Sequence, residues 1–412
     1  MTKEFGFKIE KKLANGLGRA GVIQTPHGEI KTPAFIVVAT KANVKSLTVE
    51  QVKGLGAQAV LANTYHLYLE PGDELVKKAG GFPKMMNWQG PTFTDSGGFQ
   101  AFSLGVAFGT TITKLSKGET EAADSTKNFA RSTDQEPLAK ITEDGVEFKS
   151  YRDGSKHFFT PEKSMEIQRN LGADIIFAFD ECTSPTADKK YQKEAMERTH
   201  RWAARSLERH RELQAESEKL KVGEGNRKQA LFGIVQGGRF QDLRKESAEV
   251  IGKMDFDGFG IGGSFDKTDI GLSVGLVNKI LPEEKPRHLL GIGEPEDMFL
   301  AIENGCDTFD CVAPTRTARN GTLYTKEGRI HIENNQYRED LGPIEKGCGC
   351  YTCKNYSVAY LSFLHRAHEL TFHPLASIHN LYFLVNLVEK IRQSILDGNF
   401  EEFKNSFLKT YK

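Results

Sequence analysis

The sequence predicts an α/β fold, a (β/α)8 TIM barrel followed by a smaller C-terminal subdomain. Short apolar runs rich in β-branched residues recur eight times, and amphipathic helical patterns lie between several of them. Such continuous apolar runs are typical of parallel strands buried on both faces. Polar residues gather where the runs end. A doubly wound open sheet is the competing interpretation, and the count of eight favours the barrel.

The expected elements follow each other along the chain in a regular βα order. The barrel strands are expected at Thr32–Val38, Ala59–Asn63, Thr92–Thr94, Ile175–Phe179, Leu231–Val235, Gly258–Gly262, His288–Ile292 and Thr308–Cys311. Amphipathic patterns of good helix formers predict helices at Pro161–Asn170, Lys189–Glu216 and Phe240–Lys253.

Two polar segments interrupt this order. Leu104–Lys140 is rich in Ser, Thr, Lys, Glu and Ala and predicts a flexible insertion after the third strand. Gln214–Gln229 predicts a second polar loop, before the fifth strand. After the eighth strand the pattern changes to short strands within Asn320–Ile332, then to helices at Val358–Glu369 and Ile378–Leu396.

Bulk composition describes an ordinary globular protein. The 412 residues include 55 basic and 55 acidic side chains, so composition alone predicts no nucleic-acid or membrane partner, and any basic face must be local. The charged start of the chain and the lack of a run of about 18 apolar residues predict neither a signal peptide nor a membrane span. Few cysteines fit a reducing compartment, so we expect a cytoplasmic protein.

A metal-ligand pattern lies in the C-terminal region. Cys348, Cys350, Cys353 and His379 form a Cys3His set, which suits one closed, structural zinc site per chain. A disulfide cluster is the alternative, but the other cysteines are scattered and no secretory signal is evident. The predicted domains are a barrel over residues 1–319, with a flexible insertion at about 105–139, and a zinc-binding subdomain with C-terminal helices over residues 320–412.

Chemistry in a (β/α)8 barrel lies at the C-terminal ends of the strands. The residues found there are Asn63, Asp95, Asp180, Gln236, Gly262, Gly263 and Asp310. Any one Asp at a strand end is about as often a helix cap or a loop ion pair as a functional group. Three that converge on one mouth repel each other and lose solvation, which is typical of acid–base or nucleophilic work.

Neighbouring residues add binding chemistry. Asp95 is followed by Ser96 and two glycines; the glycines expose backbone N–H groups, and Phe99 offers a stacking face. The Gln236 amide, which both donates and accepts, suits a base edge or a sugar. Arg316 and Arg319 suit phosphate or base contacts, although exposed arginines are more often only solvated. Cys182 is by default a small buried hydrophobe.

These residues predict cleavage at an anomeric carbon, with one carboxylate as nucleophile and one as acid/base. A dinucleotide-type G-x-G-x-x-G at Gly258–Gly263 is discounted because its glycines lie inside a strand. Nothing calls for an organic cofactor. The residues alone do not name the substrate.

At several of these positions the chain strongly resembles the bacterial-type tRNA-guanine transglycosylases. The matching stretches are Asn63–Leu67, Thr94–Gln100, Phe179–Cys182, Gly233–Gly237, Phe309–Val312, Pro314–Arg316, Ala318–Gly321, the cysteine cluster and Ile378–Leu381. The resemblance runs from about residue 18 to the end of the chain, with the insertion excepted.

The resemblance implies roles for individual residues. Asp310 would be the nucleophile that attacks the ribose of the wobble guanosine in a tRNA anticodon, and Asp95, oriented by Asn63, the general acid/base. The substrate-binding positions implied for the purine are Ser96, Phe99, Asp180, Cys182, Gln236, Gly262 and Gly263. Arg316 and Arg319 would read the uridines on either side of the guanine. The implied partners are such a tRNA, a 7-deazaguanine base and a second copy of the chain in a homodimer.

Departures from the family concern the incoming base. Gly262–Thr268 replaces the usual Gly-Gly-Leu-Ala-Val-Gly-Glu at the pocket wall, and Glu294 stands where a basic residue is common. Cys182 is retained at a position that in bacterial members suits the smaller base preQ1, so we favour preQ1 and keep queuine or a related base as the alternative. A non-catalytic partner subunit, an RNA-binding scaffold and an ordinary glycoside hydrolase are the rival functions; the presence of both Asp95 and Asp310 argues against the first two, and the zinc pattern against the third.

Overall fold

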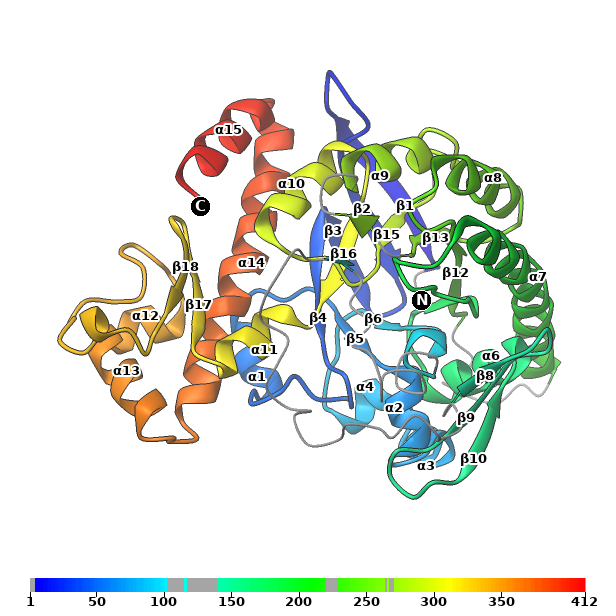
Figure 1. The fold of residues 1–412 in the computed structure, drawn as a ribbon, viewed down its shortest axis with the longest axis horizontal. Coiled ribbons are helices and arrows are strands. Elements are labelled where there is room, and N and C mark those ends of the chain that lie inside the picture. Colours follow the sequence, from blue (N-terminus) through cyan, green and yellow to red (C-terminus); the bar gives the residue numbers. More distant parts are fainter. Residues whose placement is uncertain are drawn as a thin grey trace.

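Eight parallel strands close into a barrel in the computed structural model of the chain, which describes residues 4–101, 115–116, 139–219, 228–263, 265–266 and 270–411 (Figure 1). Their order around the ring is β11-β12-β13-β15-β16-β4-β5-β6. The bounds are β4 (Ala34–Val38), β5 (Val60–Ala62), β6 (Thr92–Thr94), β11 (Ile175–Phe177), β12 (Ala230–Val235), β13 (Gly258–Ile261), β15 (Arg287–Leu289) and β16 (Thr308–Cys311). The predicted (β/α)8 barrel is thereby confirmed, with every strand in an expected run.

Several strand ends differ from the prediction by a few residues. The largest difference is in the run His288–Ile292, where β15 ends at Leu289. In the run Thr32–Val38, β3 (Gly28–Thr32) ends and β4 begins at Ala34. Pro33 separates them, because proline has no N–H to give to a strand ladder.

Helices surround the barrel and connect its strands. They are α1 (Val49–Gly54), α2 (Thr64–Leu69), α3 (Asp73–Lys78), α4 (Phe82–Met85), α6 (Pro161–Leu171), α7 (Lys189–Lys219), α8 (Gln241–Gly252), α9 (Ile270–Asn278), α10 (Pro295–Glu303) and α11 (Ala313–Arg319). Local sequence sets several of their ends. The Thr160 hydroxyl accepts from the Lys163 N–H at the start of α6, and Gly172 ends the same helix in the left-handed conformation that glycine tolerates.

The alternation of side chains along each strand divides the core into two parts. On β4, Ile36 belongs to the cluster that fills the barrel, together with Phe93 and Phe232. Phe35 belongs to the larger cluster between the strands and the outer elements. Both faces of each strand are thus buried, which explains the continuous apolar runs in the sequence.

Two antiparallel sheets were not predicted. The first contains β1 (Gly6–Lys12), β2 (Arg19–Thr25) and β3, and its Ile23 and Ile30 join the cluster inside the barrel. A buried ion pair of 2.7 Å between Arg19 and Asp307 fixes this sheet to the start of β16. The second sheet contains β8 (Ala139–Ile141), β9 (Val146–Lys149) and β10 (Lys156–Phe159).

The two predicted polar segments have different outcomes. Most of the Leu104–Lys140 insertion lies outside the described residues. Its described part is β7 (Leu115–Ser116), which pairs in parallel with β14 (Phe265–Asp266), and the first residues of β8. The predicted loop Gln214–Gln229 is wrong at its start, because α7 continues to Lys219 through a run of good helix formers. Residues 220–227 lie outside the described part of the chain.

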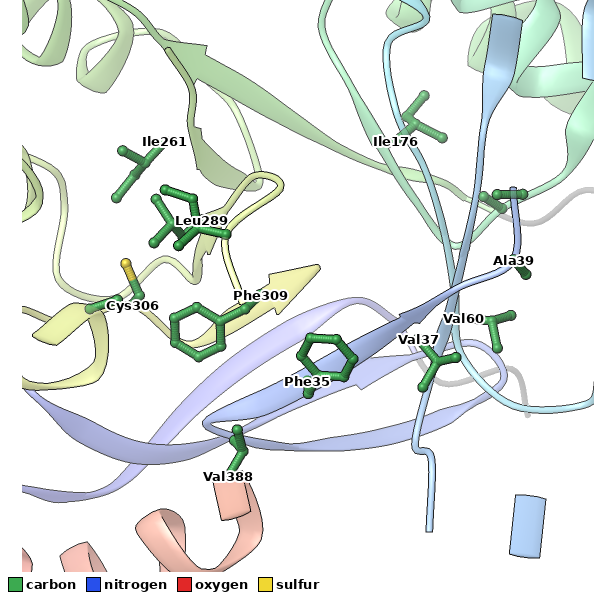
Figure 2. Packing of buried hydrophobic residues seen from close by; sticks show 14 of the residues in the cluster. Phe35, Val37, Ala39, Val60, Ile176, Ile261, Leu289, Cys306, Phe309 and Val388 are labelled. Atoms are coloured by element: carbon green, nitrogen blue, oxygen red, sulfur yellow. The ribbon is translucent and has the colours of Figure 1, made fainter. Parts of the chain in front are cut away.

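The C-terminal region packs onto the barrel. Its elements are β17 (Thr322–Thr325), β18 (Gly328–His331), the 3-10 helix η2 (Asn335–Tyr337), α12 (Tyr351–Asn355), α13 (Val358–Arg366), α14 (Phe372–Asp397) and α15 (Phe400–Thr410). Figure 2 shows Val388 of α14 beside Phe35 and Phe309 of the barrel. The barrel and α14 therefore share one hydrophobic cluster, and the domain boundary at residue 319 stays a prediction. Helix α15 was not predicted; it packs Phe403 and Phe407 against Phe299 of α10.

Candidate active site

The structure brings the polar strand ends together at one mouth of the barrel. Asn63 follows β5, Asp95 follows β6, and Asp180, Gln236 and Gly262 come after β11, β12 and β13. Asp310 lies within β16. Because parallel strands in a closed barrel end on the same side, neighbouring strands present these groups to one space.

Asp95 is held by groups at the start of α2. The Asn63 Nδ2 donates to its Oδ2, and the Thr64 backbone N–H donates to its Oδ1 at 2.8 Å. The Thr64 hydroxyl also donates to the Asp95 backbone carbonyl. These donors fix the orientation of the carboxyl group. Thr64 was not singled out in the sequence, because a backbone N–H leaves no side-chain signal.

Asp310 has a different set of donors. His288 Nε2 lies 3.1 Å from Asp310 Oδ1, and the Gly291 N–H donates to the same oxygen at 2.9 Å. The Asp310 side chain is 14% exposed, so it reaches the mouth, whereas His288 is fully buried. Sequence reasoning missed His288. The available signal was a histidine at the start of the run His288–Ile292, whose other residues are apolar or glycine.

Asp180 forms a hydrogen-bonded group with Ser96 and Gln236 at the mouth of the barrel. The Ser96 hydroxyl donates to its Oδ1 at 2.8 Å, and Gln236 Nε2 donates to its Oδ2 at 2.6 Å. The other end of the Gln236 side chain, Oε1, is buried and has no hydrogen-bond partner within the described part of the chain. A buried acceptor left in this way costs free energy, so it suits a ligand that brings a donor.

Glycines make room beside this group. A Cβ added at Gly262 would lie 2.7 Å from Gln236 Nε2, closer than real side chains come. Gly263 has a φ of 95°, which favours glycine. Behind them the buried Arg244 donates to the carbonyls of Gly238 and Gly262, at 2.6 and 3.2 Å, and so ties two strand-end loops together. Burial lowers the pKa of Arg244 to about 9.

The remaining predicted pocket residues lie on the same loops. Phe99 is half-buried in the segment after β6, and Cys182 is buried in the segment after β11. Ser264 and the side chains of Phe265 and Asp266 lie outside the described residues, so the wall that departs from the family pattern is not placed.

A local basic patch borders the mouth. Arg316 is exposed and Arg319 half-buried on α11, and Lys41 and Lys45 lie in the segment after β4. Partial burial lowers the pKa of Lys45, and the nearby charges of Arg319, Lys41 and Arg316 lower it further. Positive charge is therefore concentrated here, although the chain as a whole has no net charge.

The predicted metal ligands form one cluster. The ligand atoms of Cys348, Cys350, Cys353 and His379 all lie within 4.8 Å of one another. The Sγ atoms lie 4.0, 3.5 and 3.4 Å from His379 Nδ1, close to the ~3.5 Å edge of a tetrahedral zinc site with sulfur and nitrogen ligands.

The second nitrogen of His379 supports the same interpretation. His379 Nε2 donates to the Tyr324 carbonyl at 2.6 Å, which leaves Nδ1 with its lone pair toward the thiols. The cluster can hold a metal ion. The alternative of a disulfide cluster is not seen, because all six cysteines are free.

Fold and site together define a class: a (β/α)8-barrel enzyme with carboxylates at the strand ends and a Cys3His metal-ligand cluster near its C-terminus. Within that class the chain belongs to the queuine tRNA-ribosyltransferase family, whose model matches residues 14–126 and 124–412. The predicted membership of the tRNA-guanine transglycosylases, and hence of the pentosyltransferase enzymes, is confirmed.

Similar proteins cover nearly the whole chain. The queuine tRNA-ribosyltransferase of Thermoanaerobacter pseudethanolicus is 45% identical over 408 residues, which are 98% of this chain and 97% of the relative. A putative queuine tRNA-ribosyltransferase of Archaeoglobus fulgidus is 47% identical over 402 residues, 95% of this chain and 96% of the relative. The queuine tRNA-ribosyltransferase of Fusobacterium nucleatum is 43% identical over 411 residues, which are 98% of this chain and 98% of the relative. No helix in the described ranges has the length and apolar character needed to cross a membrane.

Proposed function

We propose that this chain exchanges the wobble guanine of target tRNA anticodons for a 7-deazaguanine, through a covalent bond between Asp310 and the ribose. The observation that carries the proposal is the pair Asp310 and Asp95, held by separate donors at one mouth, with the buried acceptor of Gln236 at the same mouth. A binding protein needs no such convergent carboxylates.

The reaction divides into two displacements. The Asp310 carboxylate attacks C1′ of the ribose, an ester bond forms, and the bond from C1′ to guanine breaks with its electron pair on the base. Asp95 gives the departing guanine a proton and later takes one from the incoming base, which attacks C1′ and releases Asp310. One glycosidic bond replaces another, so the exchange needs no external energy source.

The base pocket is assigned to the group around Asp180. Its carboxylate accepts from the N–H donors of a guanine-like edge, Gln236 and the Gly263 backbone complete the edge contacts, and Phe99 stacks on the ring. Ser96 orients Asp180, while Cys182 and Gly262 shape the pocket. We favour preQ1 as the incoming base, with queuine as the alternative. A Kd comparison of the two bases distinguishes them.

The basic patch is assigned to the anticodon loop. Arg316 and Arg319 would contact the uridines that flank the target guanine, and the charges of Lys41 and Lys45 would attract the phosphates. Loop bases that are splayed out of their stack are the usual targets of sequence-specific RNA recognition.

The metal cluster is assigned to one structural zinc ion. Three thiolates and one imidazole fill a tetrahedral site and leave no open position for substrate, so the ion stabilises the fold and takes no part in the exchange. A cytoplasmic location stays a prediction.

A homodimer is proposed for the zinc-binding region. Between residues 351 and 370, exposed apolar side chains include Tyr351, Tyr360, Phe363 and Leu370, which are 54%, 41%, 56% and 78% exposed. Tyr356 contacts the rings of Tyr351 and Tyr360, so these three tyrosines form one aromatic group. A second copy of the chain is the occupant we assign, and Phe363→Glu is expected to yield monomers in sedimentation.

Exchange of labelled guanine into tRNA tests the proposed function. Wild-type protein is expected to label a tRNA with guanine at the wobble position between uridines, and to leave unlabelled a matched tRNA with adenine there. Labelling of neither RNA, with a folded protein that still binds tRNA, would instead support a non-catalytic partner subunit.

A further inference from the structure

We infer that His288 is a positioning residue for the nucleophile: it holds the Asp310 carboxylate for attack on the ribose. The inference rests on the proposed role of Asp310. It concerns a side chain that none of the sequence motifs includes.

Strand register places the two residues side by side. β15 and β16 pair in parallel, with His288 opposite Thr308 and Leu289 opposite Phe309. Thr308 and Asp310 are two residues apart on β16, so their side chains lie on the same face of the strand. The imidazole of His288 therefore meets both.

Both ring nitrogens of His288 have a partner. Nδ1 lies 2.9 Å from the Thr308 hydroxyl, and Nε2 lies 3.1 Å from Asp310 Oδ1. An ionised carboxylate has no proton to give, so Nε2 is the donor in the second contact. In the neutral ring Nδ1 then accepts from Thr308. The carboxylate, which can only accept, thus selects the tautomer that donates to it, and the Thr308 hydroxyl donates to the other nitrogen.

The surroundings fix the ring in this orientation. His288 is fully buried, and its ring centroid lies 5.6 Å from that of Phe93 and 5.3 Å from that of Phe177. Within the described part of the chain, Asp310 is the titratable side chain that contacts the imidazole. A ring held between two phenylalanines directs its N–H at the carboxylate with little freedom to turn away.

A purely structural role would not require this hydrogen bond. Phenylalanine would fill the same space between Phe93 and Phe177 but would give Asp310 no donor. The His288 N–H and the Gly291 N–H share one carboxylate oxygen, so removal of the His288 donor loosens the orientation of the nucleophile. The base contacts at Asp180 and Gln236 lie on other strands and are unaffected. The expected consequence is slower attack with unchanged base binding.

The test compares His288→Phe with His288→Gln, whose amide Nε2 carries a donor to about the same position. Formation of the covalent adduct is measured in a single turnover with an anticodon stem-loop RNA, beside the KM for guanine and the thermal unfolding of each protein. His288→Phe is expected to slow adduct formation roughly 10- to 100-fold, the effect of losing one hydrogen bond to a charged group. Its KM for guanine is expected to stay within about twofold, and His288→Gln to recover most of the rate.

The outcomes separate the inference from the proposed function. Equal loss of rate in the Phe and Gln variants, or an unchanged rate in His288→Phe, would overturn the positioning role while the wild type still exchanges guanine. A wild-type protein that forms no adduct and exchanges no guanine would overturn both. If His288→Phe fails to fold, His288→Leu replaces it as the variant without a donor, with the same expected loss.

Discussion

The three carboxylates at the barrel mouth differ in the groups that hold them. Asp95 accepts from the Thr64 backbone N–H and from Asn63, Asp310 from His288 and Gly291, and Asp180 from Ser96 and Gln236. Different donors allow carboxylates in one mouth to do different work, because each donor set stabilises its own geometry and charge.

At the residue scale, Asp180→Asn is expected to weaken base binding. The substitution replaces one acceptor oxygen of Asp180 with an NH2 group, which cannot accept. The Gln236 amide or the N–H groups of the base then lose a buried hydrogen-bond acceptor. The KM for guanine is expected to rise about 10- to 100-fold in the exchange assay. Asp255→Asn, at a side chain 82% exposed in the segment between α8 and β13, is the matched control. An unchanged KM in Asp180→Asn would remove this residue from the pocket.

Site residues were predictable where the side chain itself is a signal in the sequence, and not where the contact depends on a distant partner or on the backbone. Asp95, Asp180, Gln236 and Asp310 were predicted because each is a polar residue at the end of an apolar run. His288 was missed because its partner lies 22 positions later in sequence, and nothing in β15 alone indicates that two strands bring them together. Thr64 was missed because its contact with the Asp95 carboxylate is made by its backbone N–H, which any residue except proline would supply.

At the element scale, the long helix α7 carries titratable groups in apolar surroundings. His200 and His210 lie on it, and burial lowers the pKa of each to about 4. Repulsion by the Arg169 guanidinium adds to the effect at His210. Such groups make a helix sensitive to acid, because a neutral imidazole is required in the folded state.

His210→Gln is expected to make the protein less sensitive to acid. In the unfolded chain His210 titrates near its ordinary value of ~6.5, so the unfolded state takes up a proton first as the pH falls. Stability is therefore full above about pH 6.5 and is lost as the pH falls toward the folded-state pKa of about 4. Between these limits the unfolding free energy of the variant is expected to fall less than that of the wild type, by up to about 3 kcal/mol.

Chemical denaturation at a series of pH values measures the difference. The exposed His331, replaced by Gln, is the control that keeps the wild-type pH profile. Identical profiles for wild type and His210→Gln would contradict the argument.

The elements themselves were predictable to different degrees. The barrel strands were found because burial on both faces gives continuous apolar runs. The sheets of β1–β3 and β8–β10 were missed because several of their strands are partly exposed and short, and their pairing depends on partners rather than on pattern. The end of α7 was missed because polar helix formers resemble a loop in composition.

At the scale of the whole molecule, the C-terminal metal cluster is coupled to the barrel. His379 of α14 donates to the Tyr324 carbonyl of β17, and the same helix packs Val388 against the barrel cluster that includes Phe35. A metal ion bound by His379 would therefore hold α14 in place, and α14 packs against the barrel strands.

Cys350→Ser is expected to release the metal and destabilise the fold. Cys350 is buried, and a serine hydroxyl is a poor ligand for zinc beside two thiolates. Elemental analysis is expected to give one zinc per wild-type chain and much less than one for the variant, with a Tm lower by several °C. Cys306→Ala, at a buried thiol outside the cluster, is the control that keeps its zinc. Wild-type protein without zinc, purified without chelators, would contradict the assignment.

The covalent intermediate at Asp310 is the central claim, and the mass of the protein after incubation with an anticodon stem-loop RNA tests it most directly. With no free base added, the wild type is expected to gain the mass of the RNA minus guanine, in a denaturation-resistant adduct that peptide mapping assigns to Asp310. Asp310→Asn keeps an oxygen that accepts from His288 and Gly291, so it is expected to fold, bind RNA and form no adduct. Normal guanine exchange by Asp310→Asn, or an adduct on another residue, would contradict the account.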